Sequence, residues 1–272
     1  MPIPYAFRIW KSGVPMKRAA IFIYGVACYA VSLATFLYAI AFIGNFGLPK
    51  TMDSPRELAL GTALLVNLGL LALFAVQHSV MARPGFKRWW TRYVPEPAER
   101  STYVLFSSVL LFAVFWYWQP MGGVIWHIEA PAGRIAMYAT YGAGWALLFY
   151  TTFLINHFDL LGLRQVWLQL GGRPYTPVPF RTPWLYTKMR HPLYVGWFMI
   201  FWATPTMTVA HLVFALMTTA YILVAIPLEE RDLVAAHPEY ADYRRRVPML
   251  LPLGKRRAQD KARAQDTATR SA

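Results

Sequence analysis

Long apolar runs separated by short polar segments dominate the pattern of hydrophobic and polar positions along the chain. A membrane-spanning helix needs roughly twenty predominantly apolar residues. Four runs reach or approach that length, at residues 19–43, 58–81, 101–119 and 135–155. Each is predicted to form a transmembrane helix. The second is expected to be capped by Asp53-Ser54-Pro55, with the proline at its first helical position.

Two further apolar runs, 192–203 and 208–228, are separated by Thr204-Pro205. The first is short for a full span, so the pair is expected to form a helical hairpin that enters the membrane or crosses it with a tilt. The predicted fold is therefore all-α, a polytopic transmembrane helix bundle of five to six spans, the last two forming the hairpin. Residues 1–254 are expected to form a single integral membrane domain, followed by a charged, disordered tail at 255–272.

The composition supports a membrane location. Hydrophobic residues make up 57% of the 272 residues and charged residues only 15%, whereas a soluble domain carries about a quarter charged residues. The first apolar run follows basic residues but is too long for a signal-peptide core, so it is expected to remain as an anchor. The single cysteine, Cys28, excludes an intramolecular disulfide and a cysteine-cluster metal site, and no metal is implied.

The basic residues occur in every second loop. Lys and Arg number 27 against 13 Asp and Glu, and they concentrate in the N-terminal tail, at 82–100, at 160–190 and after residue 228. The alternate loops, near 44–57 and 119–134, have little net positive charge. By the positive-inside rule, both termini and the 160–190 connection are expected to be cytoplasmic, in a cell inner membrane. This distribution fits anionic lipid rather than nucleic acid, which is not expected as a partner.

Polar residues collect at the ends of the runs that this orientation places in the cytoplasm. They are His78 near the end of the second run, Asn156-His157-Phe158-Asp159 after the fourth, a group at 186–197, and Glu229-Glu230 after the hairpin. Polar residues inside spans are costly and often mark function. His78 could instead be a histidine hydrogen-bonded to a neighbouring helix, and Asn156, His157 and Asp159 could simply cap a helix end. Because all four groups lie on one side of the membrane in this orientation, they are expected to form a single site at the membrane boundary.

Two of these groups carry a recognisable pair of motifs. Arg190-His191-Pro192-x-Tyr194-x-Gly196 is followed about thirty residues later by Glu229-Glu230-x-x-Leu233, then by Tyr240 and Arg246-Val247-Pro248. The pair resembles the C-terminal signature of integral membrane methyltransferases, a group that includes isoprenylcysteine carboxyl methyltransferase and phospholipid N-methyltransferases. The resemblance covers roughly residues 185–252.

Three further stretches narrow the resemblance. Residues 76–84, 97–103 and 153–165, which contain His78, Arg100 and Asn156-His157-Phe158-Asp159, are similar to the bacterial methanethiol S-methyltransferase family. That resemblance implies methylation of a small volatile thiol, methanethiol, to dimethyl sulfide. It also implies S-adenosylmethionine as methyl donor and S-adenosylhomocysteine as product. Besides the thiol and the bilayer, no obligate protein partner is evident.

The resemblance also implies which residues hold the methyl donor. These cofactor-binding candidates are Tyr186, Arg190, His191, Pro192, Leu193, Tyr194, Gly196, Glu229 and Glu230. A small thiol is a weak acid whose pKa lies somewhat above the value of about 8.5 for cysteine, so a base is expected to assist thiolate formation. The catalytic candidates for that base are His78, His157, Asp159 and Glu229; the sequence does not choose among them.

Other functions remain open at this stage. A membrane methyltransferase could act on a lipid or an isoprenylcysteine-type acceptor instead. A haem-binding membrane protein could use His78, His157 and His191 as axial ligands, although the Glu229-Glu230 pair has no part in that chemistry. A transporter should show several polar residues at mid-membrane and repeated halves, neither of which is apparent.

Overall fold

The computed structural model describes residues 15–251, and the predicted tail at 255–272 lies outside them. The described chain divides into two compact units that interleave along the sequence. The first unit comprises residues 15–52, 56–120 and 156–178, and the second comprises 53–55, 121–155 and 179–251. A single domain over residues 1–254 stays a prediction.

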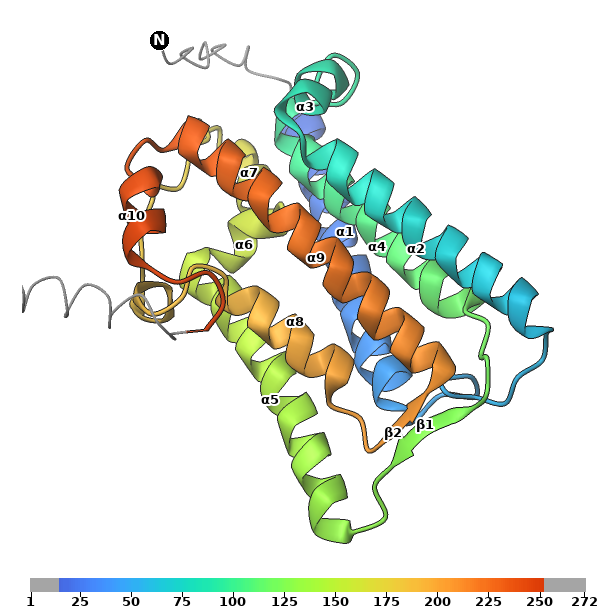
Figure 1. Cartoon of the computed structure of the whole chain (residues 1–272). Coiled ribbons are helices and arrows are strands. Elements are labelled where there is room, and N and C mark those ends of the chain that lie inside the picture. The colour runs from blue at the N-terminus through green and yellow to red at the C-terminus, as the bar shows by residue number, and fades with distance from the viewer. Residues whose placement is uncertain (1–14, 252–272) are drawn as a thin grey trace, which may run out of the picture. The chain divides into compact units, whose positions relative to one another are not determined.

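The first unit is built on three long helices. They are α1 (Pro15–Gly44), α2 (Leu60–Ala82) and α4 (Glu96–Tyr117), and α4 packs against both of the others (Figure 1). Three short helices join them: α3 (Pro84–Trp90), α6 (His157–Leu160) and α7 (Leu163–Leu170). The helix α7 lies along α1, where Val166 fills the space left by Gly25 and the Phe22 and Trp167 rings are 5.7 Å apart.

The second unit contains the helical hairpin. Its elements are β1 (Val124–His127), α5 (Pro131–Ile155), the 3₁₀ turn η1 (Trp184–Thr187), α8 (Pro192–Trp202), β2 (Thr206–Thr208), α9 (Val209–Ala236) and α10 (Tyr240–Arg246). The helix α8 packs against α5 and α9 (Figure 1). The predicted break at Thr204-Pro205 is confirmed. Thr204 and Pro205 lead into β2, which pairs antiparallel with β1. The hydrophobic pattern did not predict this strand pair.

The helical bundle with several membrane spans is confirmed. Within residues 15–251, four helices are long and apolar enough to cross a membrane, at Met16–Gly44, Leu60–Ala82, Glu96–Tyr117 and Val209–Ala236. The predicted fourth span corresponds to α5, which is 25 residues long but falls outside this set because glycine, threonine and tyrosine lower its mean hydropathy. The helix α8 has 11 residues, or about 16 Å, against a hydrocarbon core of about 30 Å.

Two local predictions are wrong. Asp53-Ser54-Pro55 does not cap α2, which begins at Leu60 after Ala59 without a side-chain cap. The Asp53 carboxylate instead accepts a hydrogen bond from Thr208 and lies 3.0 Å from Nδ1 of the buried His211, both in the second unit. In addition, α9 does not end near Leu228 but continues to Ala236 despite Pro227, so Glu229 and Glu230 lie within the helix. Contacts made by both carboxylates stabilise this extension.

Candidate functional site

The motif at residues 190–196 forms the entrance to α8. His191 is the N-cap residue, and Pro192 occupies the first helical turn, where its missing N–H costs no hydrogen bond. The preceding backbone is held by the C-terminal segment. The Arg190 amide donates to the Pro248 carbonyl at 2.9 Å, and the His191 amide donates to the Met249 carbonyl at 3.1 Å. The two halves of the predicted motif pair are therefore in direct contact within the second unit.

Glu230 lies at the centre of a buried polar network. Its Oε1 accepts from Nε of Arg190 at 2.6 Å, lies 3.0 Å from Nε2 of His191, and accepts a longer bond of 3.4 Å from the Tyr240 hydroxyl. Nη1 of Arg190 also donates to the carbonyls of Arg244 and Val247. Arg190 and Glu230 are 8% and 5% exposed. A buried charge is costly unless it is paired, and here Arg190 and Glu230 pair with each other. Their contacts join the start of α8 to the end of α9 and to α10.

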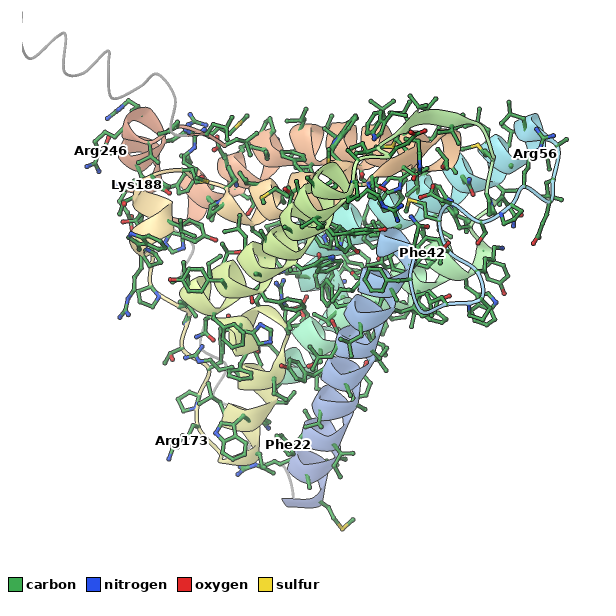
Figure 2. All side chains as sticks on the ribbon, turned by 90° about the horizontal axis from the view of Figure 1, so that it is seen from below. Phe22, Phe42, Arg56, Arg173, Lys188 and Arg246 are labelled. Atoms are coloured by element: carbon green, nitrogen blue, oxygen red, sulfur yellow. The ribbon has the colours of Figure 1, made fainter. Side chains whose placement is uncertain are left out.

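The flanking residues Lys188 and Arg246 are labelled at the same end of the second unit in Figure 2. Both side chains are exposed. Exposed basic side chains therefore lie close in sequence to Arg190 and to the α10 residues of the buried network.

Glu229 has a different environment from its neighbour. Its side chain is half-buried, and its Oε2 accepts from the Tyr194 hydroxyl at 2.6 Å. Among residues 15–251, no other hydrogen bond to this carboxylate is formed. Adjacent positions on a helix differ by about 100° in direction, which explains why Glu230 faces the network and Glu229 faces Tyr194.

Aromatic side chains surround the Glu229 carboxylate. The rings of Tyr194 and His191 stack at 5.3 Å, and Tyr186 belongs to the turn η1 just upstream. Burial raises the pKa of the Tyr186 phenol, and the neighbouring Tyr243 and Glu229 raise it further. The Tyr186 hydroxyl therefore stays protonated at neutral pH. Tyr186, Tyr194 and Glu229 together offer two phenols and one carboxylate; we call them the Glu229 cluster.

The wall behind the Glu229 cluster is apolar. Gly196 on α8 meets Gly144 on α5 so closely that a Cβ on Gly196 would lie 2.9 Å from the Gly144 carbonyl oxygen. Each glycine is followed by a tryptophan, and the rings of Trp145 and Trp197 meet nearly edge to face at 5.6 Å. Leu193, in the first turn of α8, is half-buried.

His78, in the first unit, contacts the neighbouring helix α4. Its Nδ1 is 3.2 Å from the Ser107 hydroxyl, and the Tyr103 hydroxyl lies 3.0 and 3.1 Å from its two ring nitrogens. Its ring also stacks on Phe74. These contacts match the alternative in which His78 hydrogen-bonds to a neighbouring helix.

His157 and Asp159 also belong to the first unit. His157 is buried, and its Nε2 forms a 2.9 Å hydrogen bond with the Tyr29 hydroxyl of α1. Burial lowers the pKa of this imidazole. Asp159 forms a 2.8 Å ion pair with Arg164 and accepts from the Tyr175 hydroxyl at 3.3 Å. Asn156 caps α6 by accepting from the Asp159 amide.

The candidate residues therefore form two sets. His78, His157 and Asp159 lie in the first unit, where Tyr103 and Tyr29, the partners of the two histidines, contact one small apolar cluster with Met81 and Leu161. All nine cofactor-binding candidates lie in the second unit.

Sequence reasoning missed several polar residues of these networks. Tyr29, Tyr103 and Ser107 look like ordinary members of apolar helices, so nothing in the pattern distinguishes them. His211 was detectable. It lies within an apolar run, and a histidine in such a position is a functional candidate by default.

Comparison with known proteins gives a consistent family. No family model matches the chain, and no solved structure matches it. The chain is 58% identical to methanethiol S-methyltransferase of Crocosphaera subtropica over 243 residues, which is 89% of this chain and 95% of that protein. It is 54% identical to methanethiol S-methyltransferase of Mycobacterium tuberculosis, over 87% of this chain and 98% of the relative.

A third relative extends the same result. Methanethiol S-methyltransferase 1 of Bradyrhizobium diazoefficiens is 51% identical over 85% of this chain and 81% of its own length. Identity at this level over nearly the whole of both proteins is far above chance, and it extends over both units. The chain belongs to the methanethiol S-methyltransferase family.

Proposed function

We propose that this protein transfers a methyl group from S-adenosylmethionine to methanethiol, giving dimethyl sulfide and S-adenosylhomocysteine. The 58% identity to a methanethiol S-methyltransferase over 89% of the chain carries the proposal. In the reaction, the thiol sulfur forms a bond to the methyl carbon while the bond from that carbon to the donor sulfur breaks. The thiol proton leaves to a base or to water.

The residues of the second unit fit such a donor. Bound S-adenosylmethionine supplies a methyl group on a positively charged sulfur. The Glu229 carboxylate can accept hydrogen bonds from ribose hydroxyls or from an ammonium group. The phenols of Tyr186 and Tyr194 add hydrogen-bonding groups and aromatic faces. These features support the Glu229 cluster as the donor site.

Arg190 and Glu230 support this site from behind. Nε and Nη1 of Arg190 are already engaged by Glu230 and by two carbonyl oxygens. This favours a positioning role for Arg190 over direct binding of the carboxylate of S-adenosylmethionine. Gly196 has a similar indirect part, because it lets α8 approach α5 closely enough to fix the direction in which Tyr194 leaves the helix.

The base is proposed among the four catalytic candidates, and their contacts rank them. Asp159 is paired with Arg164, and His78 is hydrogen-bonded to Tyr103 and Ser107. Each of these would have to exchange an existing contact to accept a proton from the thiol. His157 is hydrogen-bonded to Tyr29, although it is neutral at pH 7 because burial lowers its pKa. Glu229 has one oxygen that accepts no hydrogen bond among the described residues. Glu229 is therefore the leading candidate, and His157 is the second.

The proposed location follows from the charge pattern. The protein is expected in the cell inner membrane, with both termini and the donor site at the cytoplasmic face. A water-soluble donor would then enter from the cytoplasm, and the apolar thiol would partition from the bilayer.

One experiment tests reaction, substrate and donor together. Purified protein in detergent is titrated with S-adenosylmethionine by calorimetry, then supplied with methanethiol while headspace dimethyl sulfide is measured. We expect saturable binding and dimethyl sulfide that depends on both compounds. Binding without dimethyl sulfide would redirect the search to larger thiols and lipids, and absence of binding would reject the donor.

A second experiment separates the base from the donor site. A lost base is compensated at high pH, where the thiol ionises without help, whereas a lost donor contact is not. Glu229→Gln and His157→Gln are therefore compared from pH 7 to pH 10. The variant whose kcat recovers with rising pH has lost the base. A variant with raised KM for the donor at every pH has lost a donor contact.

A further inference from the structure

An apolar groove lies on the first unit where α1 meets the start of α4. Its volume is about 320 Å³. Its lining includes Ala20, Ile21 and Tyr24 of α1, with Pro95, Ala98 and Thr102 of α4. The two hydroxyls in this lining satisfy each other, because Tyr24 and Thr102 are hydrogen-bonded at 3.0 Å. The groove therefore presents almost no polar group to an occupant.

Charged residues lie close in sequence to the groove lining: Lys17 and Arg92 are basic, and Glu96, next to Pro95, is acidic. Lys17 precedes Ile21 by one helical turn and so lies on the same face of α1. Arg92 lies two positions before Val94, which also lines the groove. Both side chains are exposed. Within residues 15–251 neither takes part in an ion pair.

Residues 89–93, which directly precede the groove residue Val94, have the composition of a membrane interface. Trp89 and Tyr93 are 46% and 70% exposed, and exposed tryptophan and tyrosine are enriched where lipid headgroups begin. Both helices that form the groove, α1 and α4, are long and apolar enough to cross a membrane. An apolar groove that opens beside basic residues at this depth matches the two parts of a phospholipid.

We propose that the groove binds an anionic glycerophospholipid, with one acyl chain against α1 and α4 and the phosphate against Lys17 and Arg92. Charge complementarity favours this occupant, because the exposed Lys17 and Arg92 outnumber the exposed Glu96. Methanethiol has a single carbon and one sulfur and would leave most of the groove empty. The proposal stands apart from methyl transfer, because none of these residues belongs to the Glu229 cluster.

The headgroup contact is tested by lipid retention. The purified full-length protein is exposed to an equimolar mixture of phosphatidylglycerol and phosphatidylcholine, and bound lipid is measured by native mass spectrometry. We expect phosphatidylglycerol to be preferred. Lys17→Gln and Arg92→Gln should each lower its retention about fivefold, since a basic residue near a membrane contributes about that factor. Arg56→Gln removes an equal, exposed charge at another place and should change nothing.

The acyl-chain contact is tested by blocking the groove. Ala20 is exposed, so Ala20→Phe fills the groove without disturbing buried packing and should abolish retention of either lipid. Ile23→Phe adds an aromatic ring at a position that is 67% exposed on the same helix and should have no effect. Equal retention of the two lipids, or retention unchanged in both Lys17→Gln and Ala20→Phe, would overturn the proposal.

Discussion

Burial distinguishes the two adjacent glutamates of the second unit at the scale of single residues. Glu230 is 5% exposed and is held by contacts with Arg190 and His191. Glu229, one position earlier, accepts a hydrogen bond from a single phenol, that of Tyr194, among the described residues. A carboxylate whose oxygens are already hydrogen-bonded within the protein stabilises the fold, whereas one with an oxygen still available can bind a ligand. The two side chains are therefore expected to respond differently to the same substitution.

Glu230→Gln should destabilise the protein strongly. The amide cannot neutralise Arg190, and removing one member of a buried ion pair costs about 3–5 kcal/mol. The matched control is Arg245→Gln, because the pair of Arg245 with Asp242 has side chains that are 77% and 62% exposed, and such pairs contribute about 0–1 kcal/mol. Thermal unfolding in detergent measures both variants. Equal losses in the two variants would show that the buried network does not stabilise the fold.

His157 should make stability depend on pH. Burial lowers the pKa of its imidazole in the folded protein, so the unfolded chain binds the proton more readily. This contribution is fully present above the ordinary histidine pKa of about 6.5 and is lost as the pH falls below it. His157→Gln should therefore reduce the loss of thermal stability between pH 7 and pH 5. A variant that loses as much stability as the wild type over that range would rule the effect out.

At the scale of elements, the approach of α8 to α5 determines the geometry behind the site. Gly144 and Gly196 place the two backbones in contact, and the Trp145 and Trp197 rings then meet beside them. Small residues at helix crossings are common in membrane proteins because they let backbones approach closely. Tyr194 leaves α8 within one turn of this crossing. The packing of α8 thus determines the direction of a side chain that contacts Glu229.

Gly196→Ala should destabilise the protein by about 1–3 kcal/mol, the usual range for overpacking. The added methyl group would meet the Gly144 carbonyl oxygen at 2.9 Å and the Leu148 amide nitrogen at 3.1 Å, and backbone atoms cannot move aside easily. Gly142→Ala is the control, since a Cβ there meets nothing within 4 Å and alanine is the better helix former. In thermal unfolding, Gly196→Ala should unfold at a lower temperature than the wild type, and Gly142→Ala at a higher one.

The hairpin also shows how much of the site could be predicted from sequence. The two helices of the hairpin are antiparallel, so the start of α8 lies beside the end of α9. Contact between His191 and the glutamate pair could therefore be predicted from the order of the motifs. Which glutamate is buried could not, because that depends on the face of α9 that meets α10. The position of Asp53 before an apolar run wrongly predicts a helix cap. Its contacts with Thr208 and His211 join residues more than 150 positions apart, which no local pattern reveals.

At the scale of the whole molecule, the alternation of basic and non-basic loops predicts the orientation in the membrane. Basic residues in short loops favour the cytoplasmic side. The segment at 82–100 and the connection at 160–190 are expected there, and the loops near 44–57 and 119–134 on the opposite side. The helix α5 is absent from the set of strongly apolar helices. The sides of the membrane on which the segments before and after α5 lie therefore decide whether α5 crosses it.

Single cysteines at exposed positions should report that topology. The chain has one native cysteine, Cys28, which is buried and so gives little background. We expect Arg56→Cys and Glu129→Cys to react with a membrane-impermeant maleimide when the inner membrane is intact. Arg88→Cys and Lys188→Cys should react only after that membrane is opened, because their loops carry the cytoplasmic excess of basic residues. If Glu129→Cys and Lys188→Cys reacted from the same side, α5 would not cross the membrane. The charge pattern would then describe attraction to the lipid surface rather than alternation across the bilayer.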